Sequence, residues 1–300
     1  MLQLYRQLSE LMGGMLPPLV GPTNDGHVLD IGWGMGESIY ELALKYPSSH
    51  IIGIDVDESA VKQTQSLVSE LSNVAVFVHD IHHFEDNFLS PASFGLIHLH
   101  FLAGEITLQQ FPPLLVSLTR ICLPGGLLVW TEAELPITTS LACQHLCLLV
   151  LQGLQARGHV FSQGNSLGLT ARMGSLLSDA GYKCTQSKAY AIDISARSKG
   201  NAAFVTQLNI SRQQIRTFLL EVGVATVTES EDMYLEMQQE IQEEQFCGLL
   251  YVRTVVAMRL SVRSSVDGAI TLFLQNALSR DDTNIHSYQG SAQFCPPIHF

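Results

Sequence analysis

Short apolar runs alternate with segments of helical periodicity over the first part of the chain. The apolar runs are residues 27–32, 50–55, 73–80, 94–101 and 126–133. The helical segments between them are 36–46, 57–71 and 107–122. Short strands that are almost entirely apolar are typical of a mostly parallel sheet with helices on both faces. The pattern therefore predicts an α/β fold, in which ligands bind at the carboxyl ends of the strands.

The alternation changes after Leu135, where helical segments predominate. They are 138–157, 170–181, 201–222 and 229–246, and only 183–195 and 248–260 still resemble strands. We expect helical cap insertions in an otherwise regular domain. The predicted division is an N-terminal helical cap segment at 1–22, an α/β core at 23–134 that continues at 170–198 and 248–260, cap insertions at 135–169 and 199–247, and a C-terminal extension at 261–300. Within that extension, Gly268–Ser279 has amphipathic periodicity.

The composition and charge of the chain exclude some classes of partner. Of 300 residues, 46% are hydrophobic and only 15% are charged, and the formal net charge is −12. An acidic surface repels polyphosphate, so we expect a small or neutral partner and no nucleic acid. The six cysteines lack the spacing of a disulfide scaffold or a metal site, which suggests reduced thiols and a cytoplasmic protein. The longest uncharged stretch, Leu135–Ala156, is interrupted by polar residues, so no membrane partner is expected; a homo-oligomer is possible.

The strongest chemical signal is the sequence VLDIGWGMGESIYELA at residues 28–43. A predicted strand ends there at Asp30 and passes through Gly32, Gly34 and Gly36 into a helix. Glycine permits the tight turn and lets a ligand lie against the backbone. The next two strands also end in acids, Asp55 and Asp80, which places three carboxylates along one edge of the sheet. A carboxylate at the end of the second strand can bind ribose hydroxyls, so the pattern favours a nucleoside-containing ligand.

A dinucleotide is the less favoured ligand. The dinucleotide fingerprint GxGxxG requires a third glycine at position 37, where this chain has Glu37. A pyrophosphate would also be repelled by that carboxylate and by Asp30. A ligand with a positively charged end fits these acids better. A NAD-type oxidoreductase is therefore a secondary alternative.

These residues resemble the class I S-adenosylmethionine (SAM)-dependent methyltransferases. The resemblance rests on DIGWGMG at 30–36, GID at 53–55, HDI at 79–81 and LPGG at 123–126, and it extends over about residues 25–195 and 248–260. It implies a Rossmann-like, mostly parallel seven-stranded sheet whose last strand is antiparallel and inserted beside the sixth. It also implies SAM as the cofactor. Trp33 departs from the family pattern, because that position usually carries a small residue.

The resemblance also assigns roles to individual residues. It implies that the loop with Asp30, Gly32, Trp33, Gly34 and Gly36 surrounds the methionine part of SAM. Asp55 would then bind the ribose hydroxyls and Val56 would lie against the adenine. Asp80 and Ile81 would contact the adenine edge.

On the acceptor side, His98 and His100 alternate near the end of the fourth predicted strand and therefore share a face. One or both could orient the acceptor or act as a general base, His100 first; the alternative is a hydrogen-bonded pair under the sheet. Glu132 and Glu134 could bind a polar group of the acceptor or be solvated. Adjacent His82 and His83 diverge, so no metal site is expected.

The predicted function is SAM-dependent methyl transfer to a small, largely apolar organic acceptor held under the helical cap. The cap segments are rich in Leu, Met, Phe and Tyr and poor in charge, which suits an apolar pocket that excludes water. The sequence leaves O-, N- and C-methylation open. A protein of this fold that binds SAM without transferring a methyl group is the main alternative.

Overall fold

The computed structural model describes residues 8–14, 16–17, 20–23, 26–32, 36–81 and 88–261. Several expectations fall outside these ranges. They concern Trp33 and Gly34 in the glycine turn, His82 and His83, and the C-terminal segment Gly268–Ser279. Among the described residues, no helix is both long and apolar enough to cross a bilayer.

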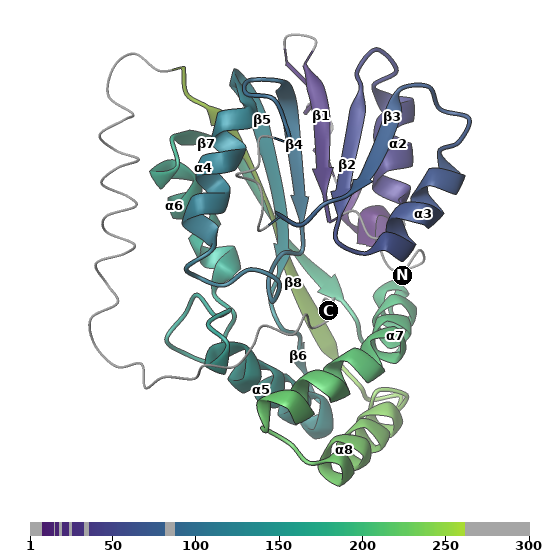
Figure 1. The fold of residues 1–300 in the computed structure, drawn as a ribbon. Coiled ribbons are helices and arrows are strands. Elements are labelled where there is room, and N and C mark those ends of the chain that lie inside the picture. The colour runs from purple at the N-terminus through teal and green to yellow at the C-terminus, as the bar shows by residue number, and fades with distance from the viewer. Residues whose placement is uncertain are drawn as a thin grey trace.

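A single twisted sheet forms the centre of the molecule (Figure 1). Its main strands are β1 (His27–Ile31), β2 (Ile51–Asp55), β3 (Val74–Val78), β4 (Phe94–His100), β5 (Cys122–Ala133), β7 (Tyr182–Asp193) and β8 (Gly248–Arg259). The order is β3-β2-β1-β4-β5-β8, and β7 pairs with β8. Strands β1 to β5 are parallel, whereas β8 is antiparallel to both β5 and β7. The α/β class and the inserted antiparallel last strand are thus confirmed.

The sheet has eight strands where the sequence predicted seven. The additional strand, β6 (Ile137–Thr138), pairs with Leu249 and Gly248 at the start of β8. β5 pairs with β8 only from Val252 onward, so the first residues of this long strand present an open backbone edge. The two residues of β6 pair with part of that edge and so satisfy some of its backbone N–H and C=O groups. A strand this short leaves no periodicity from which it could be predicted.

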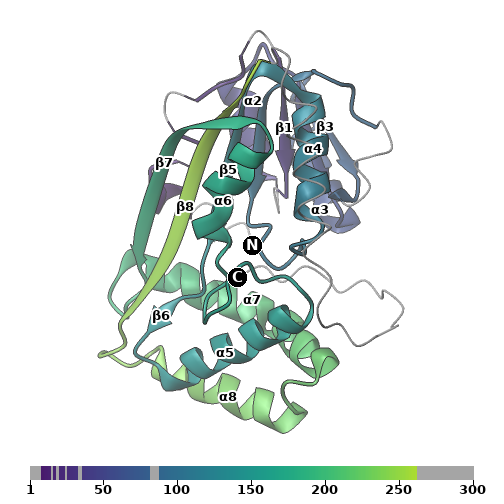
Figure 2. The ribbon, with the colours of Figure 1, turned by 90° about the vertical axis from the view of Figure 1, so that its left-hand side faces the viewer.

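Four helices cover the two faces of the sheet. They are α2 (Glu37–Lys45), α3 (Glu58–Leu67), α4 (Phe111–Ile121) and α6 (Leu169–Asp179). The chain moves from β1 toward one edge through α2 and α3, and from β4 toward the other edge through α4 and α6. Right-handed crossovers therefore place α2 and α3 on one face and α4 and α6 on the other (Figures 1 and 2). The main hydrophobic cluster lies between these layers and the sheet.

Three further helices form a separate layer, which we call the cap. They are α5 (Leu141–Ala156), α7 (Lys199–Val222) and α8 (Val227–Glu240). The parallel strands point toward this layer, and the ends of β7 and β8 extend into it (Figure 1). A second hydrophobic cluster holds the cap together, and residues 8–12 contribute Leu8 and Met12 to it. The cap therefore lies beyond the edge at which ligands of parallel sheets bind.

Candidate cofactor and acceptor site

Two glycines shape the turn between β1 and α2. Gly32 and Gly36 have φ angles of +75° and +94°, which residues with a Cβ atom rarely adopt. A Cβ atom on Gly36 would lie 2.6 Å from Thr64 Oγ1 of α3, and one on Gly32 would lie 3.3 Å from the His100 carbonyl oxygen. Both positions thus require glycine, because the turn packs closely against α3 and against the end of β4.

The acids at the ends of β2 and β3 lie at the same edge as this turn. Asp55 is half-buried, and its Oδ1 accepts a hydrogen bond from the Asp57 amide at 2.9 Å. Val56 follows it and is 40% exposed. Because Asp55 pairs with Val78 in the parallel register, the half-buried Asp80 and Ile81 emerge beside it. The structure therefore brings four of the expected cofactor residues to one edge, with a carboxylate and an apolar side chain next to each other.

Asp30 lies beneath this edge and is completely buried. Its Oδ2 accepts a hydrogen bond from Ser38 Oγ of α2 at 2.5 Å. Its Oδ1 lies 2.5 Å from His100 Nε2 and 3.1 Å from His98 Nδ1. Parallel pairing places Asp30 next to His98, so the three side chains meet on the α2 face of the sheet. The contact of Asp30 with the methionine part of SAM, implied by the resemblance, stays a prediction.

The charges in this buried cluster are strongly coupled. Burial alone would raise the pKa of Asp30, but the charge and hydrogen bond of His100, together with His98, hold that pKa well below its usual range. Burial, assisted by the charge of His100, lowers the pKa of His98 to about 4. The Asp30 carboxylate is therefore ionised at neutral pH, and the His98 imidazole is neutral.

These contacts bear on the roles expected for the two histidines. Their side chains are only 1–2% exposed and both turn toward Asp30. The ligand atoms of the three residues lie within 4.8 Å of one another, a separation that a metal ion could bridge. His100 Nε2 is hydrogen-bonded to Asp30 Oδ1, whereas His98 Nδ1 approaches the same oxygen atom at 3.1 Å without hydrogen-bond geometry. The geometry favours the alternative of buried histidines under the sheet, with His100 hydrogen-bonded to Asp30, and an acceptor role for His100 or His98 stays a prediction.

Glu132 and Glu134 were expected to bind the acceptor or to be solvated. In the structure both carboxylates accept hydrogen bonds from the protein itself, and an acceptor role for either stays a prediction. Glu132 is completely buried; its Oε1 accepts hydrogen bonds from the Leu102 amide and from Trp130 Nε1, each at 2.7 Å, and its Oε2 accepts one from the Ala103 amide at 3.2 Å. Burial raises the pKa of Glu132 to about 7 despite these three donors.

Glu134 is bound in the same manner to a different segment. Its carboxylate accepts hydrogen bonds from the amides of Leu167 and Gly168 and from Thr170 Oγ1, at 2.6–3.3 Å. Gly168 precedes α6 and has no side chain to cap that helix, so Glu134 supplies the missing acceptor. Solvation was thus the wrong expectation for Glu132, which is buried, while Glu134 is partly exposed. Loops fold over the end of β5 and place their amides against the two carboxylates.

Sequence reasoning missed two polar partners in this region. Ser38, which binds Asp30, follows the last glycine of the turn by two residues. Trp130, which binds Glu132, is two residues before it on β5 and so lies on the same face. The alternation of Trp130, Glu132 and Glu134 was the available signal, since three large polar-tipped side chains on one face of a buried strand must find partners.

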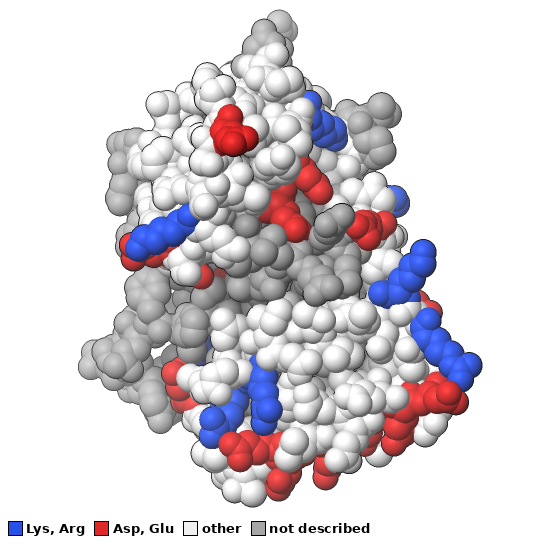
Figure 3. All heavy atoms as spheres, turned by 90° about the vertical axis from the view of Figure 1, so that its right-hand side faces the viewer, with Lys and Arg blue, Asp and Glu red and all other residues white. Residues whose placement is uncertain are grey.

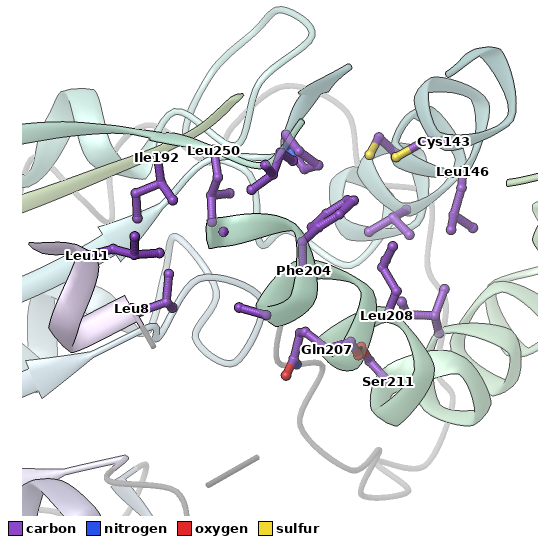
Figure 4. Close-up of a pocket in the computed structure, with 17 residues that line it drawn as sticks. Leu8, Leu11, Cys143, Leu146, Ile192, Phe204, Gln207, Leu208, Ser211 and Leu250 are labelled. Carbon is purple, nitrogen blue, oxygen red and sulfur yellow. Dashed lines mark hydrogen bonds between the residues drawn. The ribbon is translucent and has the colours of Figure 1, made fainter. Parts of the chain in front are cut away.

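The cap contains a cavity of about 50 Å³ with almost entirely apolar walls (Figure 4). Leu8 and Leu11 form one side, Phe204 of α7 projects into the middle, and Cys143 and Leu146 of α5 lie opposite. Ile192 and Leu250 contribute from the ends of β7 and β8. Among the described residues that line the cavity none is charged, and the polar ones are the two thiols Cys143 and Cys147 with Gln207 and Ser211.

The α/β part of the chain is similar in sequence to known methyltransferases. A family model described as a methyltransferase domain matches residues 22–167. The tRNA (guanine-N(7)-)-methyltransferase of Burkholderia cenocepacia is 36% identical over 76 residues, which are 25% of this chain and 30% of that protein. The enzyme of the same name from Neisseria meningitidis is 35% identical over 81 residues, or 26% and 34%. The chain thus spans about a third of the length of the curated relatives it matches.

Solved structures show a similar fold. A SAM-dependent methyltransferase of Methanosarcina mazei has a TM-score of 0.50 at 14% identity, over 82% of this chain and 99% of that one. Phosphoethanolamine N-methyltransferase 2 of Haemonchus contortus, solved with S-adenosyl-L-methionine, has a TM-score of 0.48 at 14% identity, over 86% and 52%. At such low identity, these likenesses concern the fold alone.

Proposed function

Because the chain belongs, through residues 22–167, to the class I SAM-dependent methyltransferases, we propose that it transfers a methyl group from SAM to a small, largely apolar organic acceptor held under the cap. The cap cavity is the observation that supports this acceptor class. The described residues of its walls offer hydrocarbon contacts and no charge, so an ionic acceptor would lose its hydration against them without compensation. At about 50 Å³ the cavity holds only a small group, and we expect residues 8–12 to move outward for a larger one.

The residues at the sheet edge fit SAM. The Asp55 carboxylate can accept hydrogen bonds from two ribose hydroxyls, and the exposed Val56 side chain can lie against the adenine. Asp80 and Ile81 emerge next to them, at the edge where the glycine turn after β1 begins. SAM supplies an electrophilic methyl group on a sulfonium. A buried Asp30 carboxylate below the turn adds negative charge at the edge where that cationic group binds.

The chain's main contribution to the reaction is expected to be positioning. Alignment of an acceptor atom with the methyl group can account for about 7–11 kcal/mol of the barrier, whereas a general base typically adds 10²–10⁴-fold. The two candidate bases, His98 and His100, are turned toward Asp30. Transfer therefore depends on the cap holding the acceptor and excluding water, and no proton transfer by these histidines is required.

A second acceptor class follows from the relatives, which are named tRNA (guanine-N(7)-)-methyltransferases. Against it, an RNA site needs Lys and Arg side chains that can neutralise phosphates. The formal net charge is −12, and on the face shown in Figure 3 the Lys and Arg side chains form no continuous patch. We therefore favour the small apolar acceptor and make RNA an outcome of the test.

The test is to incubate the full chain with methyl-labelled SAM and either a panel of hydrophobic alcohols, phenols and amines or bulk tRNA, and to follow S-adenosylhomocysteine release. We expect release with one of the small acceptors. Label transferred only to tRNA would contradict the proposal, and SAM binding without any release would favour the non-transferring alternative. Ala203→Phe should fill the cavity and raise the acceptor KM at least tenfold, whereas Ala202→Phe, on the exposed side of α7, should not.

A further inference from the structure

The segment after β4 is held by three consecutive bonds from β5. The Phe101 amide donates a hydrogen bond to the Thr131 carbonyl at 2.9 Å, which continues the strand pairing. The next two amides, those of Leu102 and Ala103, donate to the two oxygens of Glu132. Phe101 has a φ angle of +46°, which is uncommon for a residue with a Cβ atom. Such a backbone persists only where its surroundings fix it, and Glu132 supplies two of the bonds that do so.

This segment in turn lies against the cofactor turn. The Cβ position of Gly32 is 3.3 Å from the His100 carbonyl oxygen and 3.7 Å from Cδ2 of Leu102. Leu102 therefore packs directly beside the first glycine of the turn, while its amide is bound to Glu132. A chain of contacts thus runs from the end of β5, through Leu102, to the backbone that surrounds SAM.

We propose that Glu132 is a positioning residue of the SAM site: its ionised carboxylate fixes the segment 101–103 and, through Leu102, the shape of the cofactor turn. A carboxylate can accept all three N–H groups that face it. A protonated carboxyl has an O–H group on one oxygen, so one of the three donors loses its acceptor. The Ala103 amide has the longest of the three bonds and is the one we expect to be released.

The surroundings of Glu132 make this protonation accessible near neutral pH. Burial raises its pKa to about 7, the three donors oppose that effect, and the charge of Glu134 adds to it. Arg253 lies opposite Glu132 in the register with β8, but its guanidinium binds the Thr170 carbonyl and the Ser187 hydroxyl. Glu105, in the segment after β4, is the other acid close by in the chain. The fold thus keeps a carboxylate where burial penalises its charge, which is common at functional sites.

The experiment measures the dissociation constant for SAM between pH 5.5 and 8.5 by calorimetry. For the wild type, SAM affinity should fall at least tenfold as the pH drops through about 7. Glu132→Gln has the shape and donor of the protonated form, so it should bind SAM at least tenfold more weakly at pH 8 and show no such transition. Glu134→Gln, the matched control two residues further along β5, should bind SAM as tightly as the wild type at pH 8 and keep the transition, with its midpoint moved to lower pH because the charge of Glu134 adds to the raised pKa of Glu132.

Two further readouts separate positioning from a general loss of structure. The melting temperature of Glu132→Gln at pH 8 should be no lower than that of the wild type, because the variant lacks a buried charge. Trp130→Phe keeps the ring stacked on Phe111 but removes one donor, so it should move the midpoint of the SAM profile to higher pH. An unchanged midpoint in Trp130→Phe, or a wild-type profile in Glu132→Gln, would overturn the proposal.

This inference rests on the SAM site of the proposed function and not on the acceptor. SAM binding is measured without any acceptor, so an incorrect acceptor class leaves these results unaffected. If neither the wild type nor Glu134→Gln bound SAM at any pH, the proposed function itself would fail, together with the inference.

Discussion

Asp30 and His100 meet in the interior of the sheet, with Oδ1 and Nε2 2.5 Å apart and both side chains buried. From the sequence, Asp30 was expected to contact the cofactor and His100 the acceptor. Together with Ser38 and His98 they instead tie β1 to β4 and to α2. A buried carboxylate with several donors is stable only while those donors remain. The relationship therefore leads first to a prediction about stability.

His100→Ala should lower the free energy of unfolding by about 3–5 kcal/mol, because it leaves the Asp30 carboxylate short of a donor in the interior. His100→Gln should recover most of this loss, since the Gln amide can donate from close to the position of Nε2. Urea unfolding at pH 7 measures both. Glu58→Ala, which breaks an exposed pair with Lys62, should change stability by less than about 1 kcal/mol and serves as the control. A loss for His100→Ala no larger than for this control would contradict a structural role.

Opposing pH effects are expected from His98 and Glu132. His98 has a folded-state pKa of about 4 against 6.5 when unfolded, so its contribution to stability is present above pH 6.5 and is lost as the pH falls toward 4. Glu132 has a folded-state pKa of about 7 against 4.5, so it contributes in the opposite sense, and stability rises as the pH falls from 7 to 4.5. Each effect amounts to roughly 3 kcal/mol, and the two largely cancel near pH 5.

Single variants should reveal the two effects. Between pH 7 and pH 5, His98→Asn should become more stable because only the Glu132 effect remains. Glu132→Gln should become less stable over the same interval. Urea midpoints at the two pH values measure the difference, with the wild type changing less than either variant. Slopes of the same sign in the two variants would show that one of these titrations has been assigned wrongly.

The sheet was predictable because each strand of the α/β core is a short apolar run that ends in a polar or glycine-rich turn. Asp55 and Asp80 end two such runs, so their common edge was predictable from parallel pairing, whereas Asp30, expected at the same edge, is buried beneath it. Positions within the strands were predictable to within a few residues for the same reason. β6 was not predictable, since two residues carry no period.

The partners of the polar side chains could not be predicted. Pairing of Asp30 with His98 and His100 depends on the register between β1 and β4, which local sequence does not contain. Glu132 was expected to be solvated or to bind the acceptor. The sequence does not show that the segment at Leu102 folds over its carboxylate, because tertiary contacts set the path of that segment. A buried acid at a strand end can thus bind either a ligand or the amides of a loop, and only the structure shows which of the two it binds.

The expected SAM contact of Asp55 can be tested by removing its carboxylate. Asp55→Ala should weaken SAM binding by about one to two orders of magnitude, corresponding to loss of a charge-assisted hydrogen bond of about 1.5–3 kcal/mol. Asp57→Ala is the matched control, because that carboxylate caps α3 by accepting the Ser59 amide. It should reduce stability by about 1 kcal/mol and leave SAM affinity within about threefold. Equal losses of affinity in the two variants would indicate an indirect effect through α3.

The turn before α2 should tolerate no side chain at Gly36. Gly36→Ala combines a φ angle of +94° with a Cβ atom 2.6 Å from Thr64 Oγ1, so it should destabilise the protein and weaken SAM binding. Gly125→Ala also requires a positive φ angle, +78°, but meets no atom within 4 Å. The control should lose only the strain energy, about 1–2 kcal/mol, and keep its SAM affinity. If Gly36→Ala had the same stability and SAM affinity as Gly125→Ala, α3 would be able to move away from the added Cβ atom without loss of either.

Packing within the cap can be tested at Gly153 of α5, with Gly174 of α6, a helix that covers the sheet, as the comparison; both glycines lie inside helices. Alanine normally stabilises a helix interior by about 0.5–1 kcal/mol relative to glycine. Gly174→Ala in α6 should show this gain, since its Cβ atom would meet only Cys184 Sγ at 4.0 Å. Gly153→Ala in α5 should instead be destabilising, because its Cβ atom would lie 2.6 Å from Cε1 of Phe218 in α7.

The contact between α5 and α7 also predicts which second substitution should reduce the loss of stability caused by Gly153→Ala. Phe218→Leu removes the ring atoms that the new Cβ atom would meet, so Gly153→Ala should be less destabilising in that background than alone. Urea unfolding of the two single variants and the double variant gives the coupling. Hydrogen exchange should show that the effect of Gly153→Ala is concentrated in α5 and α7, where the second hydrophobic cluster lies. A gain in stability for Gly153→Ala equal to that for Gly174→Ala would require α5 and α7 to be packed less closely than their contact at Phe218 indicates.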